Sequence, residues 1–289
     1  MEERLVDSDG TSIGTKMFRA DGPITGLPLL VGLHGGTYTS AYFEIAGGPA
    51  GSFVDVATRN GFDVLTIDRP GYGPSDLLPE DSNDFTVQAA LLDSTINDCV
   101  EHAGAQAVVL VGHSIGGMIA LEIAARRPSW NLIGVTATGM GARIPPGGAA
   151  EQLGSAPLEG VIDLPVPDRE GVMFGPVGST EAGRTAARAS YAPTPFIELK
   201  LAPFWARIRL DDVAANVAVP VHNVLAEFDA LWDSSPDALA DFESRFAAGA
   251  GATSSIAPGV GHSIDHHTIG VATQLRQLAF ACSCALGSQ

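Results

Sequence analysis

Apolar and polar positions alternate along the chain in blocks that predict strands and helices in turn. Short, nearly continuous apolar runs predict buried strands at 29–33, 62–67, 107–111, 132–137, 221–225 and 254–257. Helical periodicity predicts helices at 51–60, 86–102, 118–127, 236–247 and 268–282. Apolar strands separated by helices predict an α/β fold, a mostly parallel sheet with helices on both faces. The first twenty residues predict a hairpin that turns near Asp9 and Gly10.

The strand pattern that ends at Val111 leads into a Gly-x-Ser-x-Gly sequence, Gly112–Gly116, and a helical pattern follows at once. A strand that turns into a helix through this sequence is typical of a nucleophile elbow. We expect Gly112 and Gly116 because a Cβ at either position would collide with a neighbouring element. We also expect Ser114 to be strained and exposed, beside the positive end of the helix that follows.

The alternation of strands and helices stops between Gly141 and Asp211, where proline and glycine are frequent. The stretch is too long for an ordinary loop, and it predicts an irregular insertion with one helical piece near 180–190. Because it follows the strand after the elbow helix, we predict a lid over Ser114. The predicted organisation is a first core part at 1–140, a lid at 141–211 and a second core part at 212–289.

Composition narrows the class of protein and its partners. The 289 residues suffice for one large domain with an insertion, and 45% hydrophobic with 17% charged residues is ordinary for a globular protein. A net charge of −17 disfavours nucleic acid and anionic membrane surfaces as partners. With no apolar segment of about 18 residues, no leader-like start and only three cysteines, we predict a protein of the reducing cytoplasm.

A serine nucleophile needs an adjacent base that a third group orients. His262 lies in a glycine-rich loop after the last strand pattern and is the predicted base. The acid is expected between Ser114 and His262, because elbow-type hydrolases run in the order Ser, acid, His. Asp229 follows the strand at 221–225, and we favour it over its neighbours Glu227 and Asp233.

A second glycine-rich loop, His34–Thr37, follows the strand at 29–33. A loop at this place supplies one backbone N–H of an oxyanion hole, and the residue after the nucleophile supplies the other. We assign these donors to Gly36 and Ile115, with Thr37 as the alternative to Gly36. A phosphate-binding loop is disfavoured because the chain has no Gly-x-x-x-x-Gly-Lys sequence.

Taken together, these motifs resemble the α/β-hydrolase superfamily, in its serine esterase and lipase-like branch, over nearly the whole chain. The matching segments are 34–36, 68–75, 112–117, 228–229 and 261–262. The resemblance implies a structural role for 68–75, and the serine argues against the dehalogenase and epoxide hydrolase branches, which use aspartate. The insertion departs from the family, because it lacks the clear helices of many members.

The resemblance and the candidate triad imply acyl transfer to water through an acyl-enzyme, without a cofactor. Carboxylic ester hydrolysis is the default. Thioesters, lactones, amides and carbon–carbon bonds are alternative substrates for the same triad. A non-catalytic ligand receptor on this fold is the alternative from another class.

Aromatic residues near the expected mouth of the site predict a small, mostly apolar substrate. The predicted contacts are Tyr38, Phe174, Trp205 and Trp232. The four-residue spacing of His262 and His266 could suit a metal on one helical face. Because the triad already uses His262, we predict no metal site.

Overall fold

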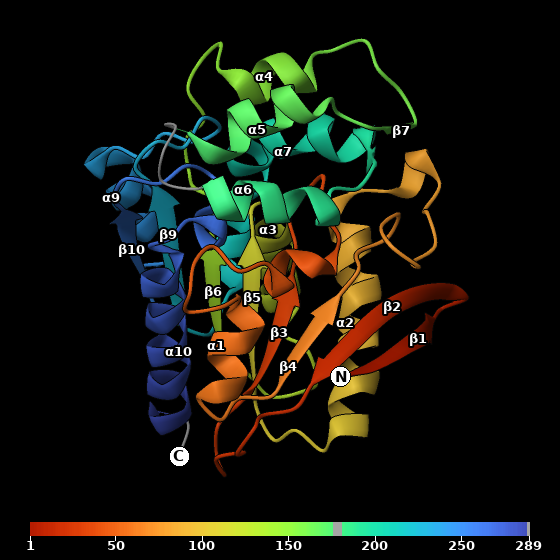
Figure 1. Ribbon diagram of the computed structural model, residues 1–289, viewed down its shortest axis with the longest axis vertical. Coiled ribbons are helices and arrows are strands. Elements are labelled where there is room, and N and C mark those ends of the chain that lie inside the picture. The colour runs from red at the N-terminus through yellow and green to blue at the C-terminus, as the bar shows by residue number, and fades with distance from the viewer. Residues whose placement is uncertain (176–180, 288–289) are drawn as a thin grey trace.

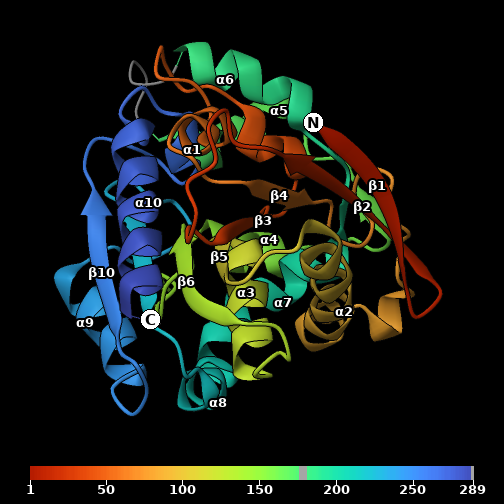
Figure 2. The ribbon, with the colours of Figure 1, turned by 90° about the horizontal axis from the view of Figure 1, so that it is seen from below.

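The computed structural model describes residues 1–175 and 181–287, and its centre is a twisted sheet between two layers of helices (Figures 1 and 2). The strand order is β1-β2-β4-β3-β5-β6-β9-β10, with β1 and β2 antiparallel to their neighbours and the others parallel. The strands are β1 (Glu2–Ser8), β2 (Thr11–Phe18), β3 (Leu29–Leu33), β4 (Val64–Ile67), β5 (Val108–His113), β6 (Leu132–Thr138), β9 (Val221–Ala226) and β10 (Ala252–Ala257). The predicted α/β fold is confirmed.

Each predicted strand is present, with ends that shift by at most two residues. The central strands β3 and β5 are buried along their whole length, which explains why their sequences are apolar without alternation. The predicted hairpin joins β1 to β2. Asp9 and Gly10 both have positive φ, 52° and 79°, as the tightest hairpin turns require.

Two helical layers cover the sheet, and all five predicted helices are among them. Helices α1 and α10 cover one face, while α2, α3 and α8 cover the other (Figure 2). The helices of these layers, with α9 beside β10, are α1 (Phe53–Arg59), α2 (Phe85–Ala103), α3 (Ile115–Ala125), α8 (Leu210–Asn216), α9 (Pro236–Arg245) and α10 (Gly270–Gly287). Side-chain caps at Ser52, Asp84 and Ser235 fix where three of them begin.

The described residues of the predicted lid, 141–175 and 181–211, here called the cap segment, lie together beyond one end of the sheet (Figure 1). They contain α4 (Ala149–Gly154), β7 (Val161–Ile162), α5 (Val166–Phe174), α6 (Glu181–Ala187), β8 (Thr194–Pro195), α7 (Phe196–Ile208) and the start of α8. The prediction of an irregular segment was therefore wrong. Gly148, Pro165, Pro195 and Gly175 flank these helices, so the prolines and glycines mark helix ends. In the predicted helical piece at 180–190, residue 180 lies outside the described residues.

Four short 3₁₀ turns complete the described elements. They are η1 (Ser40–Glu44), η2 (Glu80–Ser82), η3 (Arg188–Ser190) and η4 (Ile264–His266). Within residues 1–175 and 181–287, every helix is too short or too polar to cross a bilayer.

The apolar core has one large cluster on each face of the sheet. The second half of α7 belongs to the larger cluster through Trp205 and Ala206, and Leu210 of α8 joins them. The predicted boundary at residue 211 therefore falls inside continuous core packing. The cap segment is attached to the core by buried side chains as well as by the chain itself.

Candidate active site

Ser114 occupies the turn between β5 and α3, with φ 53° and ψ −122°. This is a strained backbone for a residue other than glycine. The turn is held by a hydrogen bond from the Ser114 N–H to the carbonyl of Thr138, 2.8 Å long, while Gly117 and Met118 donate to the Ser114 carbonyl. Ser114 is only 8% exposed, so the expectation that it is exposed was wrong. It borders a cavity that residues of the cap segment also line.

Two glycines make the turn possible. A Cβ on Gly112 would lie 2.4 Å from Cα of Gly117, and one on Gly116 would lie 2.0 Å from the carbonyl oxygen of Leu33. Both neighbours are backbone atoms that have no room to move aside. Strand and helix therefore approach each other as closely as the sequence predicts.

His262 and Asp229 come together although they are 33 residues apart. Nδ1 of His262 lies 2.9 Å from Oδ2 and 3.1 Å from Oδ1 of Asp229, and both side chains are fully buried. The backbone N–H groups of Leu231 and Trp232 donate to Oδ1 and fix the carboxylate. Nε2 of His262 is buried without a hydrogen-bond partner among the described residues, so this nitrogen is free to accept a proton.

The two competing acids point elsewhere. Glu227 is exposed, and its Oε2 accepts a hydrogen bond from the backbone N–H of Gly259. Oδ1 of Asp233 accepts from the backbone N–H of Ser235, just before α9. Of the three acids weighed from the sequence, Asp229 is the one that the structure pairs with His262.

A second histidine, His113, lies beside the candidate base. Its ring centre is 5.0 Å from that of His262, and it stacks on Tyr42 at 4.3 Å. Burial, together with the neighbouring histidines, holds the pKa of His113 well below 6.5, so no positive charge forms there. Gly139 closes the space behind both rings, since a Cβ there would lie 3.0 Å from Cε1 of His262 and 3.1 Å from that of His113. Only its place directly after β6 distinguishes Gly139 in the sequence.

Gly36 and Ile115, the predicted oxyanion donors, both border the cavity that Ser114 faces, and so does Thr37. Ile115 is the first residue of α3, where a backbone N–H has no partner within the helix. Gly36 lies close to both Ile115 and α7, because a Cβ on it would be 3.1 Å from Cδ1 of Ile115 and 3.5 Å from Cδ2 of Leu199.

The cavity has a volume of about 390 Å³, and its walls are almost entirely apolar. Ser114, Ile115 and Met118 of the elbow and α3 line it, as do Leu231 and Trp232 after β9. The cap helices supply the rest through Ala149, Ala150, Gln152 and Leu153 of α4, Asp168, Arg169, Val172 and Met173 of α5, and Leu199, Ala202 and Pro203 of α7. These residues recur at helical spacing within the insertion, a signal that sequence reasoning missed.

One of the four predicted substrate contacts, Trp232, lines the cavity. The other three do not. Tyr38 is fully buried and its hydroxyl lies 3.1 Å from that of Ser263. Trp205 donates from Nε1 to Glu122 in the core, 2.9 Å away, and Phe174 is fully buried in the other core cluster. These aromatic side chains stabilise the fold instead of contacting a ligand.

The histidines after His262 also have structural partners. Nε2 of His266 lies 3.0 Å from the carbonyl of Tyr42, and the Tyr42 hydroxyl donates to Asp265 at 2.9 Å. In the part of the chain that the structure describes, there is no group of three or more His, Cys, Asp or Glu side chains placed to hold a metal ion.

We expect the melting temperature to fall between pH 7 and pH 5. Burial lowers the pKa of His34, His113 and His266, to about 4 for His266, so they stay neutral when folded but bind protons when unfolded below about pH 6.5. The unfolded state then binds more protons than the folded state. Each such histidine therefore lowers the free energy of unfolding by about 1 kcal/mol for each unit that the pH falls below 6.5. Burial raises the pKa of Asp265 to about 6, so this carboxyl binds a proton on folding and offsets part of the loss.

Calorimetry at constant ionic strength measures this dependence. His266→Gln should make it shallower, whereas substitution of His102, which lies on the surface, should leave it unchanged. A melting temperature that is constant or rises toward pH 5 would contradict the prediction.

Comparison with known proteins identifies the family of this chain. The family model described as "Alpha/beta hydrolase family" matches residues 30–272. The chain belongs to this family. In this α/β-hydrolase the matched range runs from β3 to α10 and includes Ser114, Asp229, His262 and the cap segment.

Among curated proteins, this α/β-hydrolase is similar to the uncharacterized hydrolase YugF of Bacillus subtilis (strain 168), with 34% identity over 70 residues. The similarity spans 24% of this chain and 24% of that relative.

Solved structures of α/β-hydrolases share the fold over nearly the whole chain. A soluble variant of monoglyceride lipase from Saccharomyces cerevisiae has a TM-score of 0.72 and 17% identity, covering 98% of this chain and 94% of that one. Proline iminopeptidase of Mycobacterium smegmatis has a TM-score of 0.69 and 17% identity, covering 100% of each chain. An esterase from Exiguobacterium antarcticum has a TM-score of 0.68 and 16% identity, covering 97% and 98%. Their names point to different substrates, so the shared fold does not select one.

Proposed function

We propose that this α/β-hydrolase cleaves a small, mostly apolar carboxylic ester through an acyl-enzyme on Ser114. The pairing of Asp229 with His262 supports this most strongly, because it leaves Nε2 of His262 as the nitrogen that can take the serine proton. The apolar cavity beside Ser114 favours an acyl group without charge.

The proposed chemistry uses these residues in turn. Nε2 of His262 accepts the proton of the Ser114 hydroxyl as its oxygen attacks the ester carbonyl carbon, and Asp229 stabilises the imidazolium. The N–H groups of Gly36 and Ile115 stabilise the negative oxygen of the tetrahedral intermediate. His262 then returns the proton to the departing alcohol. In the second half, water loses a proton to His262, attacks the acyl-enzyme and releases the carboxylic acid.

A panel of p-nitrophenyl esters with acyl chains from acetate to decanoate tests the proposal, with fluorophosphonate labelling as a second measurement. Turnover together with labelling at Ser114 supports a serine esterase. Higher kcat/KM on matched thioesters, lactones or amides would reassign the bond that is cleaved. Tight binding of an ester with neither turnover nor labelling would show a receptor on this fold and contradict the proposal.

Filling the cavity should shorten the acyl chain that the enzyme accepts. Ala150 lies on α4, is 9% exposed and lines the cavity. Ala150→Phe is expected to raise KM about tenfold or more for octanoate while changing the acetate value little, because the ring takes space that only a long chain uses. Ala182→Phe, on an exposed position of α6 away from the cavity wall, is the matched control. An equal rise in KM for both esters would contradict the assignment of this cavity to the acyl chain.

A further inference from the structure

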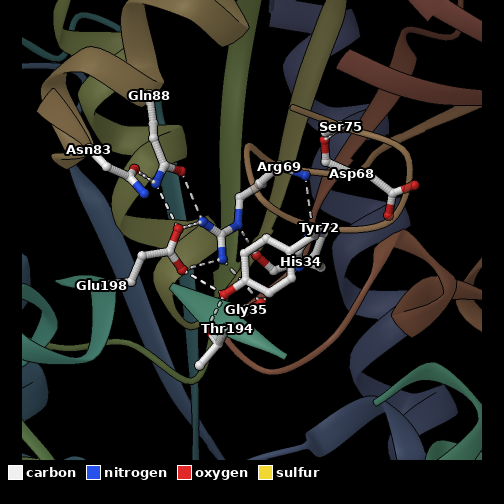
Figure 3. Close-up of polar contacts among 10 residues, drawn as sticks. All are labelled: His34, Gly35, Asp68, Arg69, Tyr72, Ser75, Asn83, Gln88, Thr194 and Glu198. Atoms are coloured by element: carbon white, nitrogen blue, oxygen red, sulfur yellow. Dashed lines mark hydrogen bonds and ion pairs between the residues drawn. The ribbon is translucent and has the colours of Figure 1, made fainter. Parts of the chain in front are cut away.

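Arg69 is a fully buried cation in the loop after β4, and it pairs with Glu198 of the cap helix α7 (Figure 3). The two side chains have no exposed surface. Nη1 of Arg69 lies 2.6 Å from Oε1 of Glu198, and Nη2 lies 3.0 Å from Oε2. Such a two-pronged contact fixes the plane of the guanidinium as well as its position.

The same guanidinium binds the loop that carries the candidate oxyanion donor. Nε of Arg69 donates to the carbonyl of His34 at 2.8 Å, and Nη2 donates to the carbonyl of Gly35 at 3.2 Å. Nη1 also donates to Oε1 of Gln88 at 2.9 Å. With the two bonds to Glu198, all five N–H groups of Arg69 are used. Lysine has neither the number nor the planar arrangement of donors to replace it.

His34 adds a second donor to the same carbonyl. The backbone N–H of Arg69 donates to Nε2 of His34 at 3.0 Å, so Nε2 is the acceptor and Nδ1 carries the ring proton. Nδ1 lies 2.7 Å from the carbonyl oxygen of Gly35 and donates to it. The Gly35 carbonyl is therefore held from two directions, by His34 and by Arg69.

The orientation of one peptide group connects these contacts to the cavity. The carbonyl of Gly35 and the N–H of Gly36 belong to the same planar trans peptide, so they point in opposite directions. Holding the carbonyl toward Arg69 turns the N–H of Gly36 away from Arg69. Gly36 borders the cavity that Ser114 also borders, so an N–H of Gly36 turned away from Arg69 can serve the oxyanion.

Glu198 is itself held in place by residues of the core and the cap. Its Oε1 accepts from Nε2 of Gln88 at 2.6 Å, and its Oε2 accepts from the hydroxyl of Tyr72 at 2.7 Å. The Tyr72 hydroxyl also bonds the hydroxyl of Thr194 in β8 (Figure 3). Every charge in the group is paired, which a buried network requires.

We propose that Arg69 is a positioning residue for the oxyanion hole, and that Glu198 holds it in place from the cap. The proposal rests on the function proposed above, because it assigns Arg69 to the stabilisation of a tetrahedral intermediate. Removing a single oxyanion-hole donor typically lowers kcat about 10²- to 10³-fold. A donor that is misplaced but still present should lose less, roughly 10- to 100-fold.

The test compares two charge-neutral double variants. R69Q/E198Q removes the ion pair and the bonds from the guanidinium to His34 and Gly35. E122Q/R209Q removes another two-pronged Arg–Glu pair, between α3 and the residue before α8, with Arg209 Nη2 2.9 Å from Oε2 of Glu122. This pair is more exposed than Arg69–Glu198, and among the described residues it has no hydrogen bond to the oxyanion loop. The measurements are kcat and KM on a p-nitrophenyl ester, the inhibition constant of a trifluoromethyl ketone with the same acyl chain, and the melting temperature.

We expect R69Q/E198Q to lower kcat and to weaken trifluoromethyl ketone binding by the same factor, with KM within about twofold of wild type. The control should lose melting temperature but keep kcat and inhibitor affinity. R69K keeps a cation opposite Glu198, and it should still lose kcat because three N–H groups on one nitrogen cannot replace the five bonds of the guanidinium to Glu198, Gln88 and the two carbonyls. R69K also tests the proposal if the double variant R69Q/E198Q does not fold.

Wild-type kcat in R69K, or equal losses in both double variants, would overturn the proposal while leaving the serine esterase intact. A wild-type protein that neither turns over esters nor binds the trifluoromethyl ketone would instead overturn the proposed function, and the role of Arg69 with it.

Discussion

Ser114→Ala is expected to abolish fluorophosphonate labelling and to lower kcat by several orders of magnitude, about 10⁴- to 10⁶-fold. The reason is that Ser114 carries the hydroxyl in the strained turn between β5 and α3, and it lines the apolar cavity. The remaining rate would come from binding and from the oxyanion hole alone. The measurements are labelling followed by mass spectrometry, and kcat on the best ester of the panel.

The fold should survive this substitution, because alanine removes one hydroxyl and keeps the backbone contacts with Thr138 and Gly117. Circular dichroism and the melting temperature verify that. Ser263→Ala is the matched control, a buried serine next to His262 whose hydroxyl contacts Tyr38. Labelling that persists in Ser114→Ala, or that disappears in Ser263→Ala, would show that the nucleophile is misassigned.

Asp229→Asn should lower kcat about 10⁴-fold, the effect known for the equivalent change in a serine protease. The carboxylate accepts from Leu231 and Trp232 on one oxygen and faces Nδ1 of His262 with both. An amide in the same place presents N–H to Nδ1, which favours the tautomer with the proton on Nε2. A nitrogen that already carries a proton cannot accept one from Ser114.

Glu227→Gln and Asp233→Asn should each reduce kcat less than about threefold, because both carboxylates bond loop backbone away from His262. The comparison is made on kcat/KM from pH 5 to pH 9, with stability measured separately. If Asp233→Asn were the impaired variant and Asp229→Asn were active, the pairing seen here would not be the working one.

The parts that could be predicted from the sequence depend on neighbours along the chain. Strands β3 and β5 are almost entirely apolar, and a Cβ on Gly112 or Gly116 would lie 2.4 or 2.0 Å from backbone atoms of neighbouring elements. The acid and base could be placed because each follows a strand at the same edge of a parallel sheet. Local pattern and topology were sufficient to predict the turn at Ser114 and the pairing of Asp229 with His262.

The parts that could not be predicted depend on contacts distant in sequence. Arg69 and Glu198 are 129 residues apart, and neither lies in a pattern that distinguishes a buried pair from two surface charges. An aromatic side chain looks the same in a sequence whether it fills the core, as Trp205 does, or lines the cavity, as Trp232 does. The cap helices were missed because proline and glycine at helix ends resemble the composition of a loop.

The buried pair of Arg69 and Glu198 also restricts how a substrate can reach Ser114. Swinging α7 away from the core would carry Glu198 with it and leave the Arg69 guanidinium unpaired in the interior, at a cost of about 3 to 5 kcal/mol. Such an open state would be occupied by roughly one molecule in 10³ at any moment. Among the described residues, the side-chain hydrogen bonds of α4 stay within 147–152, so no polar contact ties this helix to the core. Substrate access is therefore expected to leave α7 in place as a fixed wall of the cavity.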